Sequence, residues 1–337
     1  MDYKELVKKY WFVGVLAIAL IIFIGIYAAD VVKNQEPTVP SKQVDSKYVV
    51  YSVDGENVFA DDFYDSLYAE NGLSCAFIAF QRAVLDGAYE TTEEMNNIAT
   101  NYAAYMYQTY GEDYVMTQLK AMGYTNGPND LIQYYIDAQK SNLLITDYLK
   151  AHQADVVNPY IEEQTPRIIY HILIKLANVE ISADKDGNQT YIAKPTEEET
   201  QKLNDVLEAL KTMSFQEVAQ MYSDDSSATN GGYIGVISLE NQSNYYPVFS
   251  KKSLELASGE VSEPIVSSAG YHIIWNAGST AEELLKDEQF ISSIQEHSPQ
   301  ISMKAVLEKA DELGYKIVDE QLQTLIDSQL VESEDAE

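Results

Sequence analysis

The chain has 337 residues, 46% of them hydrophobic, so it is long enough for two folded domains and too apolar for a wholly disordered protein. Its 53 acidic residues against 22 basic ones give a formal net charge of −31. Like charges repel, so this composition argues against nucleic acid or an anionic membrane surface as a partner. The single cysteine, Cys75, cannot form an intrachain disulfide, and we expect it to be a small buried residue.

An uncharged apolar segment covers residues 11–29, after a basic N-terminus at residues 1–10. As a helix it would be about 28 Å long, which matches the hydrocarbon core of a bilayer. The preceding lysines predict that residues 1–10 stay in the cytoplasm and that the bulk of the chain is exported. A cleavable signal peptide is the alternative, but Ile26-Tyr-Ala-Ala-Asp30 fits its cleavage pattern poorly. We therefore predict a transmembrane signal anchor in a single-pass cell-membrane protein.

Residues 30–47 hold two prolines and no apolar periodicity, which predicts a linker. The pattern of residues 48–58 predicts a short hairpin with Asp54-Gly55 at its turn. Helical patterns then dominate up to Thr165-Pro166, where the residue before proline is pushed out of helical space. We therefore predict an N-terminal helical region over residues 48–165.

Tyrosine is unusually frequent, with 26 in the chain and five between residues 102 and 114. Its apolar ring and polar hydroxyl suit adaptable contacts with partner chains. The simpler interpretation is that most of these tyrosines are half-buried core residues of a helical domain.

Residues 166–278 alternate between strand and helix patterns, and capping boxes predict where helices begin. Such a box pairs a Ser or Thr with a Glu three residues later. The chain has three of them: Thr196 with Glu199, Ser214 with Glu217, and Thr280 with Glu283. The third box predicts the start of a helical segment over residues 279–331, before an acidic tail at 332–337.

Two of the four histidines lie in the middle of predicted strands. Strand alternation puts His171 on one face with Ile169 and Leu173, and puts His272 on one face with Ile274. The second strand follows a tight turn at residues 268–270, which predicts an antiparallel hairpin. Taken alone, each histidine is more readily a hydrogen-bonded core residue than a ligand or a catalyst.

Several stretches together resemble the parvulin family of peptidyl-prolyl cis/trans isomerases. The main ones are His171-Ile-Leu-Ile-Lys175, the sequence YSDDSSATNGGYIG at 222–235, and Gly270-Tyr-His-Ile-Ile274. Shorter similarities are PVFSKKSL at 247–254 and LASGEVSEP at 256–264. The resemblance extends over residues 167–276 in the order that the family has.

The resemblance implies an α+β chain in which the parvulin domain, at residues 166–278, is a four-stranded antiparallel sheet flanked by helices. This domain would be inserted in a mainly helical chaperone domain built from residues 48–165 and 279–331. One N-terminal transmembrane helix would precede both. The PrsA-like foldases of Gram-positive bacteria have this order of anchor, N-terminal region, parvulin domain and C-terminal helix.

The resemblance also implies which residues act. Four fall on the family's catalytic positions, with the histidines as a hydrogen-bonded pair backed by a serine: His171, Asp225, His272 and Ser267. Three fall on positions that bind the proline ring: Ile234, Tyr245 and Phe249. The implied reaction is rotation about an X-Pro bond, which faces a barrier of ~20 kcal/mol. It needs no cofactor, metal or covalent intermediate.

Parvulins that select phosphorylated Ser/Thr-Pro bonds carry a basic loop after the first strand. Here residues 176–187 contain one lysine and three acidic residues. A phosphate would lack partners there, so we expect no phospho-specificity. The run Asp184-Lys-Asp-Gly-Asn188 also has some character of a calcium loop, but no bidentate Glu follows at the required spacing, which favours a hairpin turn.

We therefore predict a membrane-anchored peptidyl-prolyl isomerase and foldase whose partners are unfolded exported polypeptides. The bulk of the chain would lie outside the membrane of a Gram-positive bacterium, and a homodimer is left open. One alternative is a non-catalytic holdase that uses a degenerate parvulin domain as a client-binding module. Another is a metalloenzyme with His171, His272 and Asp225 as a 2-His-1-carboxylate site. The intact polar residues argue against the holdase, and the metal-free fold that the resemblance implies argues against the metalloenzyme.

Overall fold

The computed structural model describes residues 43–44, 47–53, 56–68, 72–121, 124, 127–183 and 189–331. The predicted anchor at 11–29 and the acidic tail at 332–337 lie outside these residues. No helix within the described ranges is long and apolar enough to cross a membrane. The described chain forms two compact units, one of residues 146–298 and one of residues 299–331 with the residues that precede 146.

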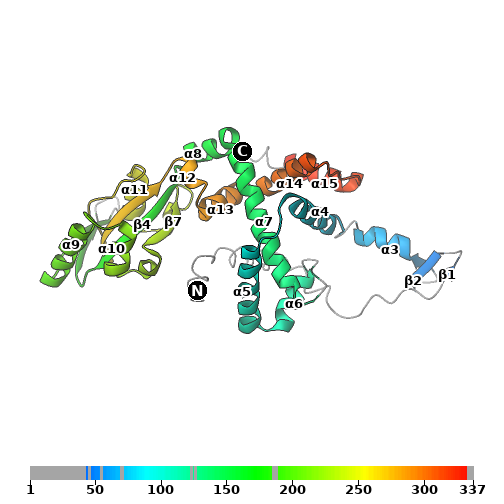
Figure 1. Cartoon of the computed structure of the whole chain (residues 1–337), viewed down its shortest axis with the longest axis horizontal. Coiled ribbons are helices and arrows are strands. Elements are labelled where there is room, and N and C mark those ends of the chain that lie inside the picture. Colours follow the sequence, from blue (N-terminus) through cyan, green and yellow to red (C-terminus); the bar gives the residue numbers. More distant parts are fainter. Residues whose placement is uncertain are drawn as a thin grey trace. The chain divides into compact units, whose positions relative to one another are not determined.

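The second unit is mainly helical (Figure 1). Its helices are α4 (Leu73–Ala88), α5 (Glu93–Tyr110), α6 (Glu112–Ala121), most of α7 (Asp130–Ala151), α14 (Gln300–Leu313) and α15 (Glu320–Val331). Both α14 and α15 contact α4, so the C-terminal segment packs on the N-terminal region. A turn at residues 128–129 directly precedes α7, and α14 ends at Gly314 in the left-handed conformation that favours glycine.

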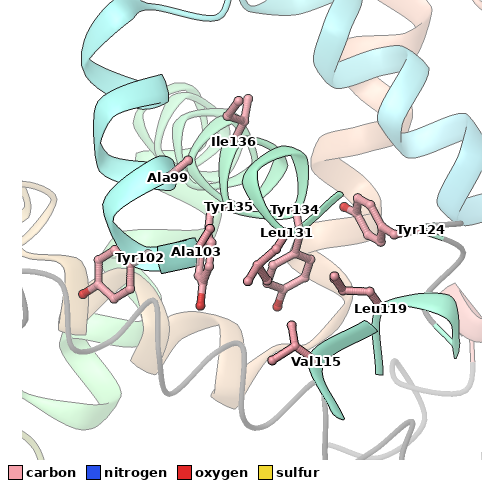
Figure 2. Packing of buried hydrophobic residues seen from close by; sticks show 10 residues of the cluster. All are labelled: Ala99, Tyr102, Ala103, Val115, Leu119, Tyr124, Leu131, Tyr134, Tyr135 and Ile136. Atoms are coloured by element: carbon pink, nitrogen blue, oxygen red, sulfur yellow. The ribbon is translucent and has the colours of Figure 1, made fainter. Parts of the chain in front are cut away.

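A tyrosine-rich core lies between α5, α6 and α7 (Figure 2). Its buried residues are Ala99, Tyr102, Ala103, Val115, Leu119, Tyr124, Leu131, Tyr134, Tyr135 and Ile136. Tyr135 packs against Tyr102 and Tyr134, with ring centroids 5.3 and 5.4 Å apart. These tyrosines are therefore core residues, whereas Tyr110 and Tyr114 are exposed.

Two predictions for the N-terminal region need correction. The predicted linker at 30–47 ends in a short strand, β1 (Gln43–Val44), which pairs with β2 (Lys47–Val53) because two residues suffice to extend an edge. Cys75, predicted to be a small buried residue, is exposed on α4, because no other part of the described chain covers it there. The predicted hairpin is confirmed: β2 and β3 (Glu56–Phe59) pair antiparallel, with Val53 opposite Glu56, and α3 (Ala60–Leu67) follows.

The other unit contains a four-stranded antiparallel sheet of order β7-β4-β9-β8, as predicted. The strands are β4 (Arg167–Lys175), β7 (Tyr233–Ile237), β8 (Ile265–Ser267) and β9 (Gly270–Gly278). The predicted tight hairpin joins β8 to β9, with Ser267 opposite Gly270. A separate two-stranded hairpin, β5 (Val179–Ala183) and β6 (Gln189–Ala193), follows β4.

Each face of this sheet has its own apolar core. On one face α9 (Glu197–Ala209) and α10 (Phe215–Tyr222) cover Ile172, Ile174 and Ile273. On the other face α11 (Pro247–Glu255) packs over Ile169 and Ile274. The capping boxes of Thr196 and Ser214 form as predicted, so α9 and α10 begin where the sequence indicates.

Two helices follow the sheet, α12 (Ala281–Leu284) and α13 (Glu288–His297), and α13 with its N-cap residue holds the edge strand β7. The predicted box of Thr280 starts α12. The hydroxyl of Tyr233 donates to the carboxylate of Asp287 at 2.9 Å, and Gln289 Oε1 accepts from the backbone N–H of Val236 at 3.0 Å. Helix α8 (Asn158–Gln164) belongs to the same unit through its contact of Tyr160 with Phe290.

Candidate functional site

The seven predicted site residues lie on or directly beside seven different elements of one unit. His171 lies on β4, His272 on β9 and Ser267 at the end of β8. Asp225 caps the short helix η3 (Ser226–Asn230), Ile234 lies on β7, Tyr245 follows η4 (Gln242–Asn244), and Phe249 lies on α11. The sheet register pairs His171 with Ile274 and Leu173 with His272, so both imidazoles share one face.

The two histidines form a buried pair. Their Nδ1 atoms are 3.4 Å apart, and His171 and His272 are 6% and 3% exposed. Behind them, Ser267 Oγ lies 2.7 Å from His272 Nε2 and accepts the backbone N–H of Ala269 at 3.0 Å. The strands β4, β9 and β8, which carry His171, His272 and Ser267, thus hold the pair in place.

Asp225 lies at the outer end of this pair. Its Oδ1 is 3.3 Å from His171 Nε2, an ion-pair distance without hydrogen-bond alignment, and the same oxygen accepts the Ser227 N–H at 2.8 Å. The adjacent His171 imidazole and Ser227, which outweigh the desolvation of the carboxylate, hold the pKa of Asp225 well below its ordinary value. Asp225 is therefore a carboxylate at neutral pH, and its side chain is 29% exposed.

Burial, together with the neighbouring His171, lowers the pKa of His272 from its ordinary value to about 4, against an opposing effect of Asp225. His272 is therefore neutral at pH 7. A neutral imidazole has one donor nitrogen and one acceptor nitrogen, so the bond between the two histidines fixes which nitrogen carries the proton.

One arrangement of protons satisfies every contact in this chain of groups. The carboxylate of Asp225 needs a proton on His171 Nε2, which leaves His171 Nδ1 as an acceptor. His272 Nδ1 must then donate, and its Nε2 accepts the Ser267 hydroxyl. The result is a line of dipoles that all point from Ser267 toward Asp225.

The segment that carries Asp225 is tied to β4 on both sides of the residue. Ser223 Oγ accepts the N–H of Leu173 at 3.0 Å, and Asp224 accepts the N–H of Lys175 at 3.0 Å. Gly232 O accepts the N–H of His171 at 2.8 Å, and a Cβ on Gly232 would lie 2.4 Å from His171 O. Gly232, at φ 84°, therefore permits the close approach that places Asp225 beside His171.

An apolar wall lies against the histidine pair. The ring of Phe249 packs edge-on against His171 and His272, with centroids 5.4 and 5.3 Å apart. Tyr245 stacks on Phe249 at 6.0 Å, and Ile234 packs against the same cluster. The structure thus brings all seven predicted residues together.

Sequence reasoning missed one neighbour of the site, Tyr246. Its ring centroid is 6.1 Å from that of His272, and the side chain is 44% exposed. The only sequence signal was its position next to Tyr245, because the direction of a loop side chain does not follow from local periodicity.

Three of the four ring nitrogens of the pair contact a hydrogen-bond partner in the protein, and His171 Nε2 lies 3.3 Å from Asp225 Oδ1. Within the described ranges, no group of three His, Cys, Asp or Glu side chains is arranged to hold a metal ion. Two nearby cations are also engaged: Lys202 with Asp224 at 2.6 Å and Lys194 with Glu180 at 3.5 Å.

Residues 171–277 match the family described as "Rotamase: PPIC-type PPIASE domain". The chain is 28% identical over 280 residues to "Foldase protein PrsA" of Bacillus subtilis, covering 79% of this chain and 82% of that protein. It is 41% identical over 88 residues to "Foldase protein PrsA" of Clostridium botulinum, covering 26% of this chain and 25% of that protein.

A chaperone is also similar: "Chaperone SurA" of Methylobacillus flagellatus is 26% identical over 251 residues, covering 70% of this chain and 55% of that protein. Among solved structures, "Crystal Structure of PrsA from Bacillus subtilis" aligns with a TM-score of 0.42 at 22% identity. That alignment covers 82% of this chain and 96% of the other.

Proposed function

Because the chain is a PrsA-like parvulin foldase with a peptidyl-prolyl cis/trans isomerase domain at residues 171–277, we propose that the histidine pair and its neighbours are the catalytic site. His171, His272, Ser267 and Asp225 supply a fixed electrostatic field. Ile234, Tyr245 and Phe249 hold the proline ring. The observation that carries this proposal is the continuous line of polar contacts from Ser267 to Asp225 beside one apolar wall.

The reaction is a rotation, so the site has to favour a twisted amide over either planar form. Rotation breaks the amide resonance, which shifts electron density from the carbonyl oxygen back to the proline nitrogen. An apolar wall excludes water, which strengthens the field that the carboxylate of Asp225 exerts on the carbonyl before proline. That field disfavours the planar amide, whose oxygen carries more negative charge.

Neither histidine has to transfer a proton in this mechanism. Their contribution is to keep Asp225 charged and in place, because His171 Nε2–H faces the carboxylate and His272 fixes the tautomer of His171. Ser267 fixes the tautomer of His272 in turn. Preorganised dipoles of this kind cost no reorganisation during the reaction.

We propose that the isomerase has no preference for phosphorylated substrates. Residues 176–183 follow β4 and carry no cation, and Lys194 and Lys202 already face carboxylates. A phosphate next to proline would meet Asp224 and Asp225 and be repelled.

The proposed clients are unfolded exported polypeptides, as the names of the similar foldases and chaperone suggest. We propose that residues 11–29 anchor the chain in the membrane and that residues 30–337 face outward. Carbonate extraction of membranes tests the anchor: the full chain should stay in the pellet, and a chain that starts at residue 31 should be released. The limits 48–165, 166–278 and 279–331 and a homodimer remain predictions.

Replacing His272 with alanine tests the site. His272→Ala should lower kcat/KM on a short prolyl peptide by about 100-fold, because His171 then loses the hydrogen bond that fixes its tautomer beside Asp225. His297→Ala is the matched control, since His297 belongs to the same unit and faces Glu163 and Glu240 instead. Equal activity of the His272 variant and the unchanged protein, with the fold intact by circular dichroism, would refute the site.

The same pair of variants separates catalysis from holding. Refolding of a protein limited by proline isomerisation should be accelerated by the unchanged chain and not by His272→Ala. Suppression of aggregation should survive the substitution. If neither chain accelerates refolding while both suppress aggregation, the holdase interpretation replaces the catalytic one.

A further inference from the structure

Two consecutive tyrosines at the site point in different directions. Tyr245 is partly buried and stacks on Phe249, with ring centroids 6.0 Å apart. Tyr246 is 44% exposed, and its ring lies beside His272 at 6.1 Å. The exposed part of the ring gains no folding free energy, and its position beside the histidine pair makes it available for contact with a substrate.

The backbone of Tyr246 is firmly held. Its carbonyl oxygen accepts the N–H groups of Phe249 at 2.8 Å and Ser250 at 3.0 Å. Tyr246 is therefore the N-cap residue of α11. Pro247 follows and restricts the backbone at the start of the helix. An aromatic ring on a fixed backbone can bind a partner at a low cost in conformational entropy.

The site has two distinct ends. The contacts run in the order Asp225, His171, His272, and Phe249 packs against both imidazoles. Tyr246 adjoins His272, at the end away from Asp225. One end therefore offers a carboxylate and the other an exposed aromatic ring.

We propose that Tyr246 determines specificity by contacting the side chain that follows proline in the substrate, with a preference for large apolar or aromatic residues. This inference rests on the proposed function, which puts the carbonyl before proline near Asp225 and the proline ring against Phe249. The chain leaving proline then runs past His272 to Tyr246. Ring-to-ring and ring-to-aliphatic contacts supply the preference.

The test measures kcat/KM of the full chain on two peptide series. One series varies only the residue after proline, with Phe, Leu, Ala and Glu. Tyr246→Ala should lower kcat/KM about fivefold for Phe and Leu. It should change the value for Ala and Glu by less than about twofold, and Tyr246→Phe should keep the selectivity of the unchanged chain. Tyr110→Ala removes another exposed tyrosine, 49% exposed on α5, and should have no effect.

The second series varies only the residue before proline. A selectivity change in that series, or an equal loss for all peptides, would overturn the assignment of Tyr246. Failure of the catalytic proposal has a different signature, because Asp225→Ala would then leave all peptides unaffected. If the assignment of Tyr246 is right, Tyr246→Ala keeps its activity on the Ala peptide and no longer prefers the Phe and Leu peptides.

Discussion

Both units of the chain bury a polar network, but the two networks end differently. In the helical unit, Asp137 accepts the hydroxyl of Tyr124 at 2.8 Å and the amide of Gln133 at 2.7 Å, while Arg82 lies 3.5 Å from the Tyr124 ring centroid. These groups converge on Asp137, which is 7% exposed, and Arg82 Nε lies 3.4 Å from its Oδ2. The carboxylate at the centre of this network is therefore covered.

In the isomerase unit, the network from Ser267 through the histidines ends at Asp225, whose side chain is 29% exposed and adjoins an apolar wall. A polar network whose carboxylate is covered can stabilise a fold, whereas one whose carboxylate reaches an accessible surface can act on a substrate. Burial of polar groups alone therefore does not identify a site. The predictions below test this distinction.

The largest effect is expected in the helical core. Tyr135 is almost fully buried between Tyr102 and Tyr134, so Tyr135→Ala should lower the free energy of unfolding of the helical unit by about 3–5 kcal/mol, as for other large buried aromatic residues. Hydrogen exchange of α5 to α7 should accelerate, and activity on a short peptide should be unchanged. Exposed Tyr114→Ala is the control. Loss of peptide activity in Tyr135→Ala would mean that the helical core also supports the catalytic site, so that the two networks do not act separately.

The next effect concerns pH. His272 has a folded-state pKa of about 4 against an ordinary value of 6.5, so its contribution to stability is present above pH 6.5 and is lost as the pH falls toward 4. The loss should reach on the order of 3 kcal/mol for the isomerase unit. Urea unfolding between pH 4 and 7, followed by the fluorescence of Trp275, measures this loss of stability. His272→Gln should flatten this pH dependence, and His297→Ala should leave it intact.

Asp225 and Asp224 form a matched pair of adjacent carboxylates. Asp225→Asn removes the charge at the open end of the network and should lower kcat/KM by about 100-fold, or about 2.7 kcal/mol. It should also lower the stability of the isomerase unit at pH 7, because the low pKa of Asp225 means that folding favours its charged form. Asp224→Asn affects a carboxylate that holds Lys175 N–H and Lys202, so it should lower stability and change activity less than about threefold. The reverse outcome, with Asp224 as the sensitive position, would relocate the functional end of the network.

Much of the isomerase unit could be predicted because its signals are local. Strand alternation puts His171 and His272 on strands, one tight turn pairs the strand of Ser267 with that of His272, and each capping box is contained in four residues. The pairing of β4 with β9 joins distant residues and was expected only from the resemblance to parvulins. The contact of Tyr233 with Asp287 joins residues 54 apart in sequence, and no periodicity encodes it. The exposure of Cys75 and the direction of Tyr246 likewise depend on which neighbours cover a face, which is a property of the assembled chain.

The smallest effect tests where the isomerase unit ends. The family match stops at residue 277, whereas Thr280 begins α12 with a capping box and α13 then holds β7 through Asp287 and Gln289. Thr280→Ala should therefore lower the free energy of unfolding of the isomerase unit by about 1 kcal/mol. Amide exchange of β7 should accelerate with it, because α13 covers the edge of that strand.

Thr196→Ala breaks the same motif at α9 and should cost the isomerase unit a similar amount without a selective effect on β7. If Thr280→Ala instead loosens α14 and α15 and spares β7, then α12 belongs energetically to the helical unit. In that case the strand that carries Ile234 needs no support from beyond residue 278, and the limit of the isomerase lies at the end of β9. The described contacts of Tyr233 and Val236 favour the longer unit, because both bonds reach β7 from residues after 278.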